Sequence, residues 1–265
     1  MRSVLVTGAG GGMGRATVEL LAAGGCRVFA LDRTLCPAGE NIIPIRADIT
    51  DLSSVAAALG AVREFTEDLY AIIHFAGIYA LDSLVEMEPE EFGRVFSINL
   101  GGAFLVNRTF LPLLGEGSKI VIVTSELAVR DPLPFTGIYA IAKAALDRYA
   151  YSLRMELQLH GISVSVIRAG AVDTGMLSES TRQLDAFCEK TRLYSCNAER
   201  FRRIVDSVEA RRVQPWKIAK KVSGILNAKR PRFASSVNRN PLLILFDLLP
   251  HDLRFFIIRK VLKEK

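Results

Sequence analysis

The chain has 265 residues, of which 50% are hydrophobic and 23% charged, with a formal net charge of +6. This composition excludes an intrinsically disordered protein, and the length suits one α/β domain with a full core. No run approaches the roughly 20 apolar residues of a spanning helix, and a core strand opens at Ser3, so we expect no signal peptide. Cys26, Cys36, Cys188 and Cys196 lack metal-type spacing, which favours reduced thiols in a cytoplasmic protein.

The charge is distributed unevenly along the chain. Residues 1–200 carry 18 Lys and Arg against 23 Asp and Glu, whereas residues 201–265 carry 16 against 5. A basic tail of this kind could meet nucleic acid, anionic lipid or an acidic partner. A solvated surface is the simplest interpretation, and we expect no nucleic-acid partner.

The first elements predict a nucleotide site. Ser3–Thr7 is an apolar, β-branched run typical of a central strand, Gly8–Gly14 is rich in glycine, and Arg15–Ala23 has helical apolar spacing. Strand, glycine turn and helix in this order are the context of a dinucleotide fingerprint. Glycines let the backbone approach a pyrophosphate, and the helix N-terminus offers unpaired N–H groups. A flexible loop without a ligand is the alternative.

An acidic residue ends the second predicted strand, Arg27–Asp32. Asp32 follows Gly14 by 18 residues, close to the roughly 20 expected for the carboxylate that binds the adenosine ribose. A carboxylate there repels a 2′-phosphate, so NAD is favoured over NADP. Arg33 weakens this preference, because a guanidinium pairs well with phosphate.

The next segments predict more of the sheet. Thr34–Asn41 is too short for a good helix and is expected to be a loop. Ile42–Asp48 reads as a third strand, and its Pro44 indicates an edge position. A helix is expected from Asp51 to Thr66, followed by a fourth strand at Leu69–Phe75.

One long helix is predicted from Phe92 to Leu114. Asn99 lies inside it among apolar neighbours, although asparagine is a poor helix former. Either a local backbone distortion or a structural hydrogen bond would account for it. His74, within a strand, is interpreted as a satisfied core histidine, and His160, beside a helix end, as a partner of the helix dipole.

Three polar side chains suggest proton transfer. Lys119–Ser125 predicts a buried strand that delivers a hydroxyl to its carboxyl end, where open α/β sheets bind ligands. Tyr139 and Lys143 are four residues apart, so they share one face of a helix expected to reach about His160. The pair alone is weak evidence, because Tyr-x-x-x-Lys occurs by chance on solvated helices. Ser163–Ala169 predicts a sixth strand.

Taken together, these motifs resemble the short-chain dehydrogenase/reductase family over about residues 1–175. The resemblance implies a single-domain, Rossmann-like, doubly wound parallel sheet of about seven strands with helices on both faces. It implies hydride transfer between NAD(P)(H) and an alcohol or carbonyl substrate, and a nucleotide site at the switch between the first and fourth strands. The motifs that carry it are Thr7–Gly14, Asp32, Asp48, Ala76-Gly77, Asn99, Ser125, Tyr139-x-x-x-Lys143 and Gly170-x-x-x-Thr174.

The resemblance also assigns roles to residues. Tyr139 would be the acid/base, Ser125 the partner of the substrate carbonyl, and Asn99 the anchor of a proton-relay water. The ammonium of Lys143 and the positive nicotinamide ring are expected to lower the pKa of Tyr139. The residues expected at the cofactor are Gly8, Gly12, Met13, Gly14, Asp32, Arg33, Asp48, Ile49, Ala76, Gly77, Tyr139, Lys143, Val172 and Thr174.

Departures from the family pattern leave other functions open. His74-Phe75 precedes Ala76-Gly77 where the family usually has two asparagines, and Ala169-Gly170 replaces proline-glycine. A noncatalytic dinucleotide-binding interaction protein, or an isomerase or dehydratase on the same fold, are the alternatives to an oxidoreductase. A homodimer or homotetramer acting on a small molecule is the expected form.

The C-terminal part of the chain is expected to choose the substrate. We expect residues 1–240 to form the dinucleotide-binding and catalytic domain and residues 241–265 an amphipathic helical extension of it. Residues 176–195 should form a mobile lid, whose Leu177, Leu184, Phe187 and Leu193 contact substrate or, alternatively, pack in the core. A last strand is expected at 232–234.

The extension itself reads as two helices broken by Pro250. Leu253, Phe256, Ile257 and Val261 share one stripe of the second helix, flanked by Arg and Lys. This hairpin would pack on a sister subunit, cap its own substrate pocket or lie in a membrane interface. An apolar tail near the pocket suggests a hydrophobic alcohol or ketone as substrate.

Overall fold

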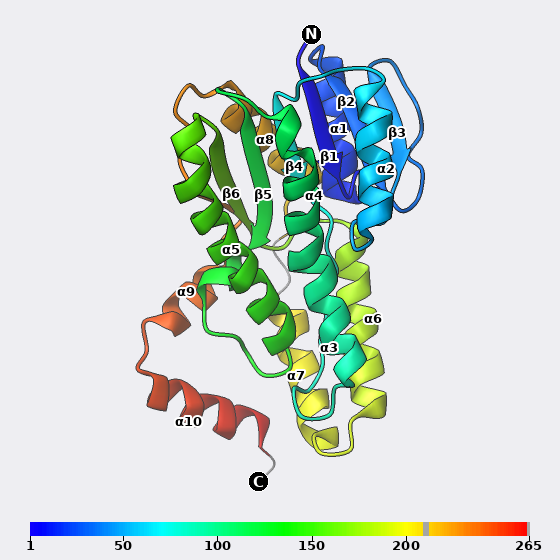
Figure 1. Cartoon of the computed structure of the whole chain (residues 1–265). Helices are drawn as coiled ribbons and strands as arrows, with labels where there is room; N and C mark the ends of the chain where they lie inside the picture. Colours follow the sequence, from blue (N-terminus) through cyan, green and yellow to red (C-terminus); the bar gives the residue numbers. More distant parts are fainter. Residues whose placement is uncertain (209–211, 264–265) are drawn as a thin grey trace.

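The computed structural model describes residues 1–208 and 212–263. For residues 177–178 and 204–208 it describes the backbone only. Within this range, seven parallel strands form one sheet in the order β3-β2-β1-β4-β5-β6-β7 (Figure 1). The reversal of strand order between β1 and β4 confirms the predicted doubly wound fold. The strands are β1 (Ser3–Thr7), β2 (Arg27–Asp32), β3 (Ile42–Arg46), β4 (Ala71–His74), β5 (Lys119–Ser125), β6 (Ser163–Ala169) and β7 (Ala234–Val237).

Helices cover both faces of the sheet, and more helices extend below its carboxyl edge (Figure 1). α1 and α8 pack on one face, and α2, α4 and α5 pack on the other. The helices are α1 (Gly12–Ala23), α2 (Leu52–Arg63), α3 (Pro89–Phe96), α4 (Gly102–Phe110), α5 (Gly137–Leu157), α6 (Gly175–Lys190), α7 (Ser195–Val208), α8 (Pro215–Asn227), α9 (Pro241–Asp247) and α10 (His251–Leu262).

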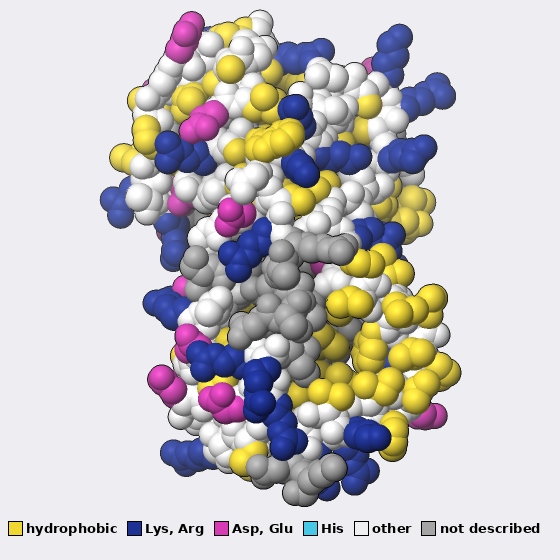
Figure 2. All heavy atoms as spheres, turned by 180° about the vertical axis from the view of Figure 1, so that it is seen from behind, with side chains coloured by type: hydrophobic (Ala, Val, Ile, Leu, Met, Phe, Trp, Pro, Cys, Tyr) yellow, Lys and Arg dark blue, Asp and Glu magenta, His cyan; other side chains and the backbone are white. Residues whose placement is uncertain are grey.

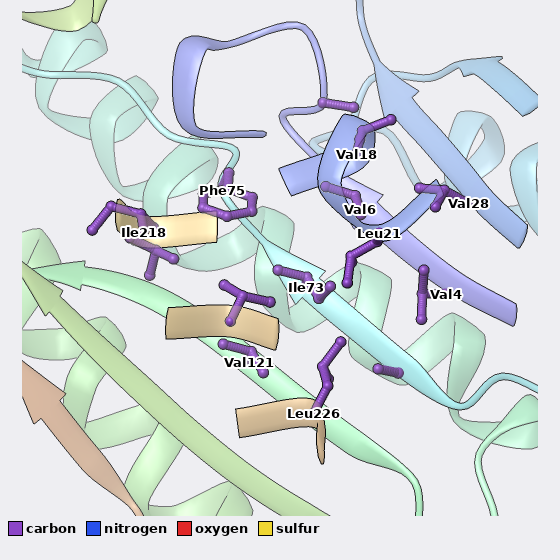
Figure 3. Close-up of a cluster of buried hydrophobic side chains, with 14 of the residues drawn as sticks. Val4, Val6, Val18, Leu21, Val28, Ile73, Phe75, Val121, Ile218 and Leu226 are labelled. Carbon is purple, nitrogen blue, oxygen red and sulfur yellow. The ribbon is translucent and has the colours of Figure 1, made fainter. Parts of the chain in front are cut away.

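The core on the α1 and α8 side shows why the central strands are apolar throughout. Figure 3 shows Val4 and Val6 of β1 facing Leu21 of α1, with Leu226 of α8 alongside Ile73 of β4. All five residues of β1 are buried, because helices cover the sheet on both sides. The sheet is therefore a rigid platform whose carboxyl edge holds the functional loops.

The predicted irregularities on the β3 side are confirmed. The segment between β2 and β3 is a loop, and β3 is the outer strand with Pro44 paired in register with Ala30. The last strand, predicted at 232–234, is found at Ala234–Val237, so that prediction was shifted. Its register with Val166–Ala169 of β6 sets the position, although Ser235 and Ser236 give the segment little apolar character.

The long helix around Asn99 is distorted as anticipated. It begins at Pro89, earlier than predicted, and a π-helical segment, Ser97–Gly101, joins α3 to α4. The Asn99 Nδ2 donates to the Ile78 carbonyl at 3.0 Å, and its Oδ1 accepts from the Ile78 amide at 3.1 Å. The local backbone distortion and the structural hydrogen bond that were predicted as alternatives therefore occur together. The widened turn directs the Asn99 amide toward the loop after β4.

His74 is the satisfied core histidine that the sequence indicated. It is 4% exposed. Its Nε2 lies 2.9 Å from Asn107 Oδ1, and Nδ1 lies 3.5 Å from the Thr7 hydroxyl. Asn107 also donates to the Tyr149 hydroxyl at 3.1 Å, which links β1, β4, α4 and α5. Burial lowers the pKa of His74 to about 4.

His74 should make the fold acid-sensitive. The unfolded chain, with a histidine pKa near 6.5, binds a proton that the folded chain refuses until about pH 4. Stability is therefore lost as pH falls through this window, by roughly 3 kcal/mol in total. Denaturant unfolding between pH 4 and 7 should show a shallower decline for His74→Asn than for the wild type. The exposed His160, changed to Asn, should keep the wild-type slope; equal slopes for all three proteins would contradict the assignment.

The helices below the sheet pack on one another around an aromatic cluster. Leu184 and Phe187 of α6 are buried beside Phe201 of α7 and Leu262 of α10. Leu184 and Phe187 therefore pack in a core, which is the alternative that the sequence left open for the predicted lid. Leu193, in contrast, is 67% exposed. The Leu177 side chain lies outside the described residues. No helix in the described part of the chain is long and apolar enough to cross a membrane.

Candidate active site

The glycine turn lies between β1 and α1, at the switch point of the sheet. Gly8 has φ +67°, a conformation that favours glycine, and a Cβ there would lie 2.5 Å from the Ala76 amide nitrogen. A Cβ on Gly14 would overlap the carbonyl oxygen of Gly8. The Arg15 amide donates to Gly11 at 2.7 Å, which starts α1 directly at the turn. The turn thus packs tightly against the end of β4 and exposes backbone at the start of a helix.

Asp32 lies beside this turn. Its Oδ2 accepts from the Gly10 amide at 3.0 Å, and its Oδ1 accepts from the Thr34 amide at 3.2 Å. A carboxylate is therefore fixed at the rim of the groove, and Arg33 also lines the groove. These contacts hold the acid that the sequence singled out for cofactor selection.

A groove of about 900 Å³ runs along the carboxyl ends of β1, β2 and β4. It brings together eleven of the residues predicted at the cofactor, which are Gly8, Gly12, Met13, Gly14, Asp32, Arg33, Asp48, Ile49, Ala76, Gly77 and Thr174. Arg94, Arg182 and Gln183 also line it, and no motif in the sequence pointed to them. Hydrogen bonds from the amide and hydroxyl of Thr50 hold one Asp48 oxygen at 2.9 and 2.7 Å and lower its pKa.

Ser125 and Tyr139 meet at the end of β5. A hydrogen bond joins their hydroxyl groups, and both residues are 7% exposed. Ser125 also accepts from the Leu127 amide at 3.2 Å, which fixes the turn after the strand. The ring of Tyr79 packs on Tyr139 with centroids 4.9 Å apart. The sequence did not reveal Tyr79, since its position depends on a contact between the loop after β4 and the distant helix α5.

Burial is the main influence on the pKa values of Tyr139 and Lys143. It raises the pKa of Tyr139 to about 12, although the hydrogen bond from Ser125 opposes the change. It lowers the pKa of Lys143 to about 8. The predicted lowering of the Tyr139 pKa relied on a bound nicotinamide as well as on Lys143. In the protein alone burial prevails, because a buried phenolate loses more hydration than the neighbouring groups return.

Lys143 and Asn99 lie beneath Gly77. The Lys143 Nζ is 5.7 Å from the centroid of the Tyr139 ring. Lys143 as a whole is 4% exposed. A Cβ on Gly77 would lie 2.6 Å from Asn99 Oδ1 and 3.0 Å from Lys143 Nζ. Glycine at this position therefore lets both side chains approach the loop after β4. The structure gathers Asn99, Ser125, Tyr139 and Lys143 as the sequence predicted.

An ion pair braces the helix that carries Tyr139. Asp147, one turn beyond Lys143 on α5, is 5% exposed and accepts from Arg168 of β6 at 2.8 and 3.0 Å. The Thr124 hydroxyl of β5 donates to the same carboxylate at 3.2 Å. These contacts tie α5, which carries Tyr139, to β6 and to β5, whose last residue is Ser125.

A second cavity of about 220 Å³ lies over the Ser125–Tyr139 pair. Its wall is mostly apolar and comes from several elements far apart in the sequence. Val172 and Thr174 of the loop after β6 line it, as do Met13 and Tyr79, which also line the larger groove. The further apolar residues on its wall are Leu127, Leu133, Met176, Phe201 and Leu243.

The comparisons with known proteins agree with this geometry. A family model described as short chain dehydrogenase matches residues 2–185. The 2,3-dihydro-2,3-dihydroxybenzoate dehydrogenase of Escherichia coli is 31% identical over 177 residues, which cover 66% of this chain and 71% of that protein.

Two solved structures match the fold. A short chain dehydrogenase from Burkholderia cenocepacia in complex with NADP has a TM-score of 0.74 at 23% identity, with 100% of both chains covered. The 3-ketoacyl-(acyl-carrier-protein) reductase from Brucella melitensis, complexed with NADH, has a TM-score of 0.73 at 23% identity and covers 89% of this chain and 96% of its own. The chain is therefore a member of the short-chain dehydrogenase family of oxidoreductases.

Proposed function

We propose that this protein transfers a hydride between NAD(P)(H) and an alcohol or ketone, with Tyr139 as the acid/base. The observation that carries the proposal is the hydrogen-bonded pair of Tyr139 and Ser125, which faces a cavity next to the glycine groove. Met13, Tyr79 and Thr174 line both spaces. A ligand in the groove and a substrate in the cavity would therefore meet beside the two hydroxyl groups.

The groove fits a dinucleotide. Glycine backbone lines it where α1 begins, so N–H groups and the positive end of the helix dipole are available to a pyrophosphate. Asp32 lies at the rim, where its charge favours a free ribose hydroxyl over a 2′-phosphate. We therefore propose NAD as the preferred cofactor. Among the matched structures one is described with NADP and one with NADH, so the family fold accommodates either.

The chain's own residues supply the proton chemistry. A bound nicotinamide would supply or accept the hydride. Tyr139, with a pKa raised to about 12, holds its proton at neutral pH and can donate it to a carbonyl oxygen. Ser125 lies beside Tyr139 and can donate a second hydrogen bond to the same oxygen as charge develops there. The ammonium of Lys143, near the Tyr139 ring, favours the phenolate that remains after transfer.

The lining of the cavity over Tyr139 favours a hydrophobic substrate. Leu127, Leu133, Phe201 and Leu243 contribute apolar wall, and the volume is about 220 Å³. Apolar walls with a few fixed polar groups are typical of sites that bind small, largely apolar molecules. We propose a secondary alcohol or ketone of this kind.

Thermal-shift titration with NADH and NADPH tests the cofactor proposal. A ligand present at a hundred times its dissociation constant stabilises the fold by about 2.7 kcal/mol. NADH should therefore raise Tm, and by more than NADPH at the same concentration. Asp32→Ser should lower the ratio of NADH affinity to NADPH affinity by at least about tenfold (about 1.4 kcal/mol), which narrows or reverses the difference in Tm shift. Asp68→Ser, an exposed acid outside the groove, is the matched control.

The outcomes separate the candidate functions. A larger shift with NADPH would mean that Arg33 overrides Asp32. If neither nucleotide moves Tm, the groove is not a working cofactor site and the oxidoreductase proposal fails. Tight nucleotide binding without turnover on a panel of ketones would favour the noncatalytic alternative.

A further inference from the structure

Helices α9 and α10 leave an unusual amount of apolar surface exposed. Figure 2, seen from behind, shows hydrophobic side chains gathered at the lower right, which corresponds to the lower left of Figure 1, where α9 and α10 lie. Monomeric soluble proteins rarely leave a contiguous patch of this kind without a partner. We call it the apolar face; it consists of Leu242, Leu245, Leu248, Leu253, Phe256 and Val261, each at least 43% exposed.

Positive charge surrounds the apolar face. Arg239 precedes α9, and Arg259, Lys260 and Lys263 lie at the end of α10, all with exposed side chains. Among described residues 239–263, Asp252 is the exposed acid. Figure 2 shows Lys and Arg side chains along the borders of the hydrophobic patch. The face therefore combines apolar anchors with an excess of cations.

The two helices are fixed to the body of the protein. Arg130, whose side chain is 4% exposed, forms an ion pair with Asp247 of α9. Arg254 of α10 donates to Asp131 at 2.7 Å. The opposite side of α10 packs into the aromatic cluster through Leu262. These contacts attach both helices to the body of the protein, and the residues of the apolar face remain exposed to solvent.

We infer that the apolar face binds the surface of a bilayer that contains anionic lipids. Amphipathic helices with basic residues lie in such interfaces, where apolar side chains enter the acyl boundary and cations meet the headgroups. A second copy of the chain complements the face less well. A second copy would present the same excess of cations to this face, whereas an anionic bilayer presents the opposite charge.

Helix α9 and the residue before it also form part of the wall of the cavity over Tyr139. Asn240 and Leu243, at the start of α9, line the cavity over Tyr139, and the Asn240 amide donates to Glu126 at 2.9 Å. Leu242 and Leu245 lie on the exposed side of the helix. If the proposed function holds, a bilayer bound to this face lies beside the substrate cavity. An apolar ketone dissolved in the membrane would then have a short path to the site.

Vesicle co-sedimentation of the full chain tests the inference, and it requires neither cofactor nor turnover. Vesicles of phosphatidylcholine with phosphatidylglycerol should bind the wild type at least about tenfold more tightly than phosphatidylcholine alone, because each cation near an anionic surface contributes roughly fivefold. Molar salt should weaken this binding. The double variant Leu245→Asp/Phe256→Asp should lose it, and Lys260→Glu should weaken it by about tenfold or more.

Matched controls lie at the other end of the sheet. Leu159, 82% exposed, and Lys229 both lie shortly before a strand begins, at the edge opposite the apolar face. Leu159→Asp and Lys229→Glu should bind vesicles as the wild type does. The NADH-induced Tm shift, measured on every variant, shows which variants remain folded with an intact groove, and its failure in the wild type would count against the proposed function alone.

Three results would overturn the inference. The wild type could fail to sediment with anionic vesicles, or the double variant could bind as well as the wild type. Light scattering in buffer could instead show a dimer that the double variant dissociates while no vesicles bind. That last result would assign the face to a second copy of the chain.

Discussion

Replacement of Tyr139 by phenylalanine should reduce turnover by about a thousandfold while NADH binding is retained. The substitution removes one oxygen, and general acid–base groups typically contribute 10²- to 10⁴-fold to rate. The ring would remain packed on Tyr79, so the shape of the site is preserved. The Ser125 hydroxyl loses its partner but keeps the Leu127 amide. Steady-state rates on a ketone that the wild type reduces give the effect, and the NADH-induced Tm shift reports binding.

Tyr151→Phe is the matched control for this experiment. Tyr151 lies on the same helix, α5, and is 50% exposed, so loss of its hydroxyl should leave both turnover and Tm near the wild-type values. Turnover of Tyr139→Phe within about tenfold of the wild type would remove Tyr139 from the acid/base role. Loss of the NADH shift would mean that the hydroxyl positions the cofactor as well.

The parts of the site that the sequence predicts well are those set by local chain geometry. The glycine turn, Asp32 at the end of β2 and the four-residue spacing of Tyr139 and Lys143 each lie within one short segment. A parallel sheet then brings the ends of its strands to one edge, so residues that end strands meet without further information. Even the distortion at Asn99 had a local signal, because asparagine is a poor residue for the middle of a helix.

What the sequence could not predict depends on contacts between distant segments. The ion pair of Arg130 with Asp247 joins residues 117 apart, and no motif announces it. Burial raises the pKa of Tyr139 in the protein without a bound nicotinamide, and the sequence did not show this because the depth of burial is a property of the assembled fold. The position of β7 is set by pairing with β6 rather than by the propensity of its serines.

The predicted stripe on α10 shows the same limit. Periodicity grouped Leu253, Phe256, Ile257 and Val261. The structure exposes all of these but Ile257, which is half-buried, and it buries Leu262. A helical wheel identifies which residues share a face, but only packing decides which face turns inward. Helix α10 has apolar residues on two sides. One side packs on the body through Leu262, so the other side, part of the apolar face, stays exposed.

Gly14→Ala should lower stability by about 1–3 kcal/mol and abolish the Tm shift with NADH. Alanine normally stabilises a helix relative to glycine by about 1 kcal/mol. Here the new Cβ would overlap the Gly8 carbonyl oxygen and lie 2.8 Å from its carbon, so backbone must move. That cost resembles overpacking of a core. Since the same turn lines the nucleotide groove, its displacement should weaken NADH at least about a hundredfold, or about 2.7 kcal/mol.

Gly60→Ala makes the sign of this effect diagnostic. Gly60 lies in α2, and a Cβ there would meet nothing within 4 Å. This variant should gain about 1 kcal/mol, or roughly 2–4 °C in Tm, and keep the full NADH shift. Opposite changes in Tm for the same chemical substitution would trace the loss to the contact of Gly14 with Gly8. A Gly14→Ala protein as stable as Gly60→Ala, with an unchanged NADH shift, would show instead that the turn tolerates a side chain and that its glycine is not needed to hold the nucleotide.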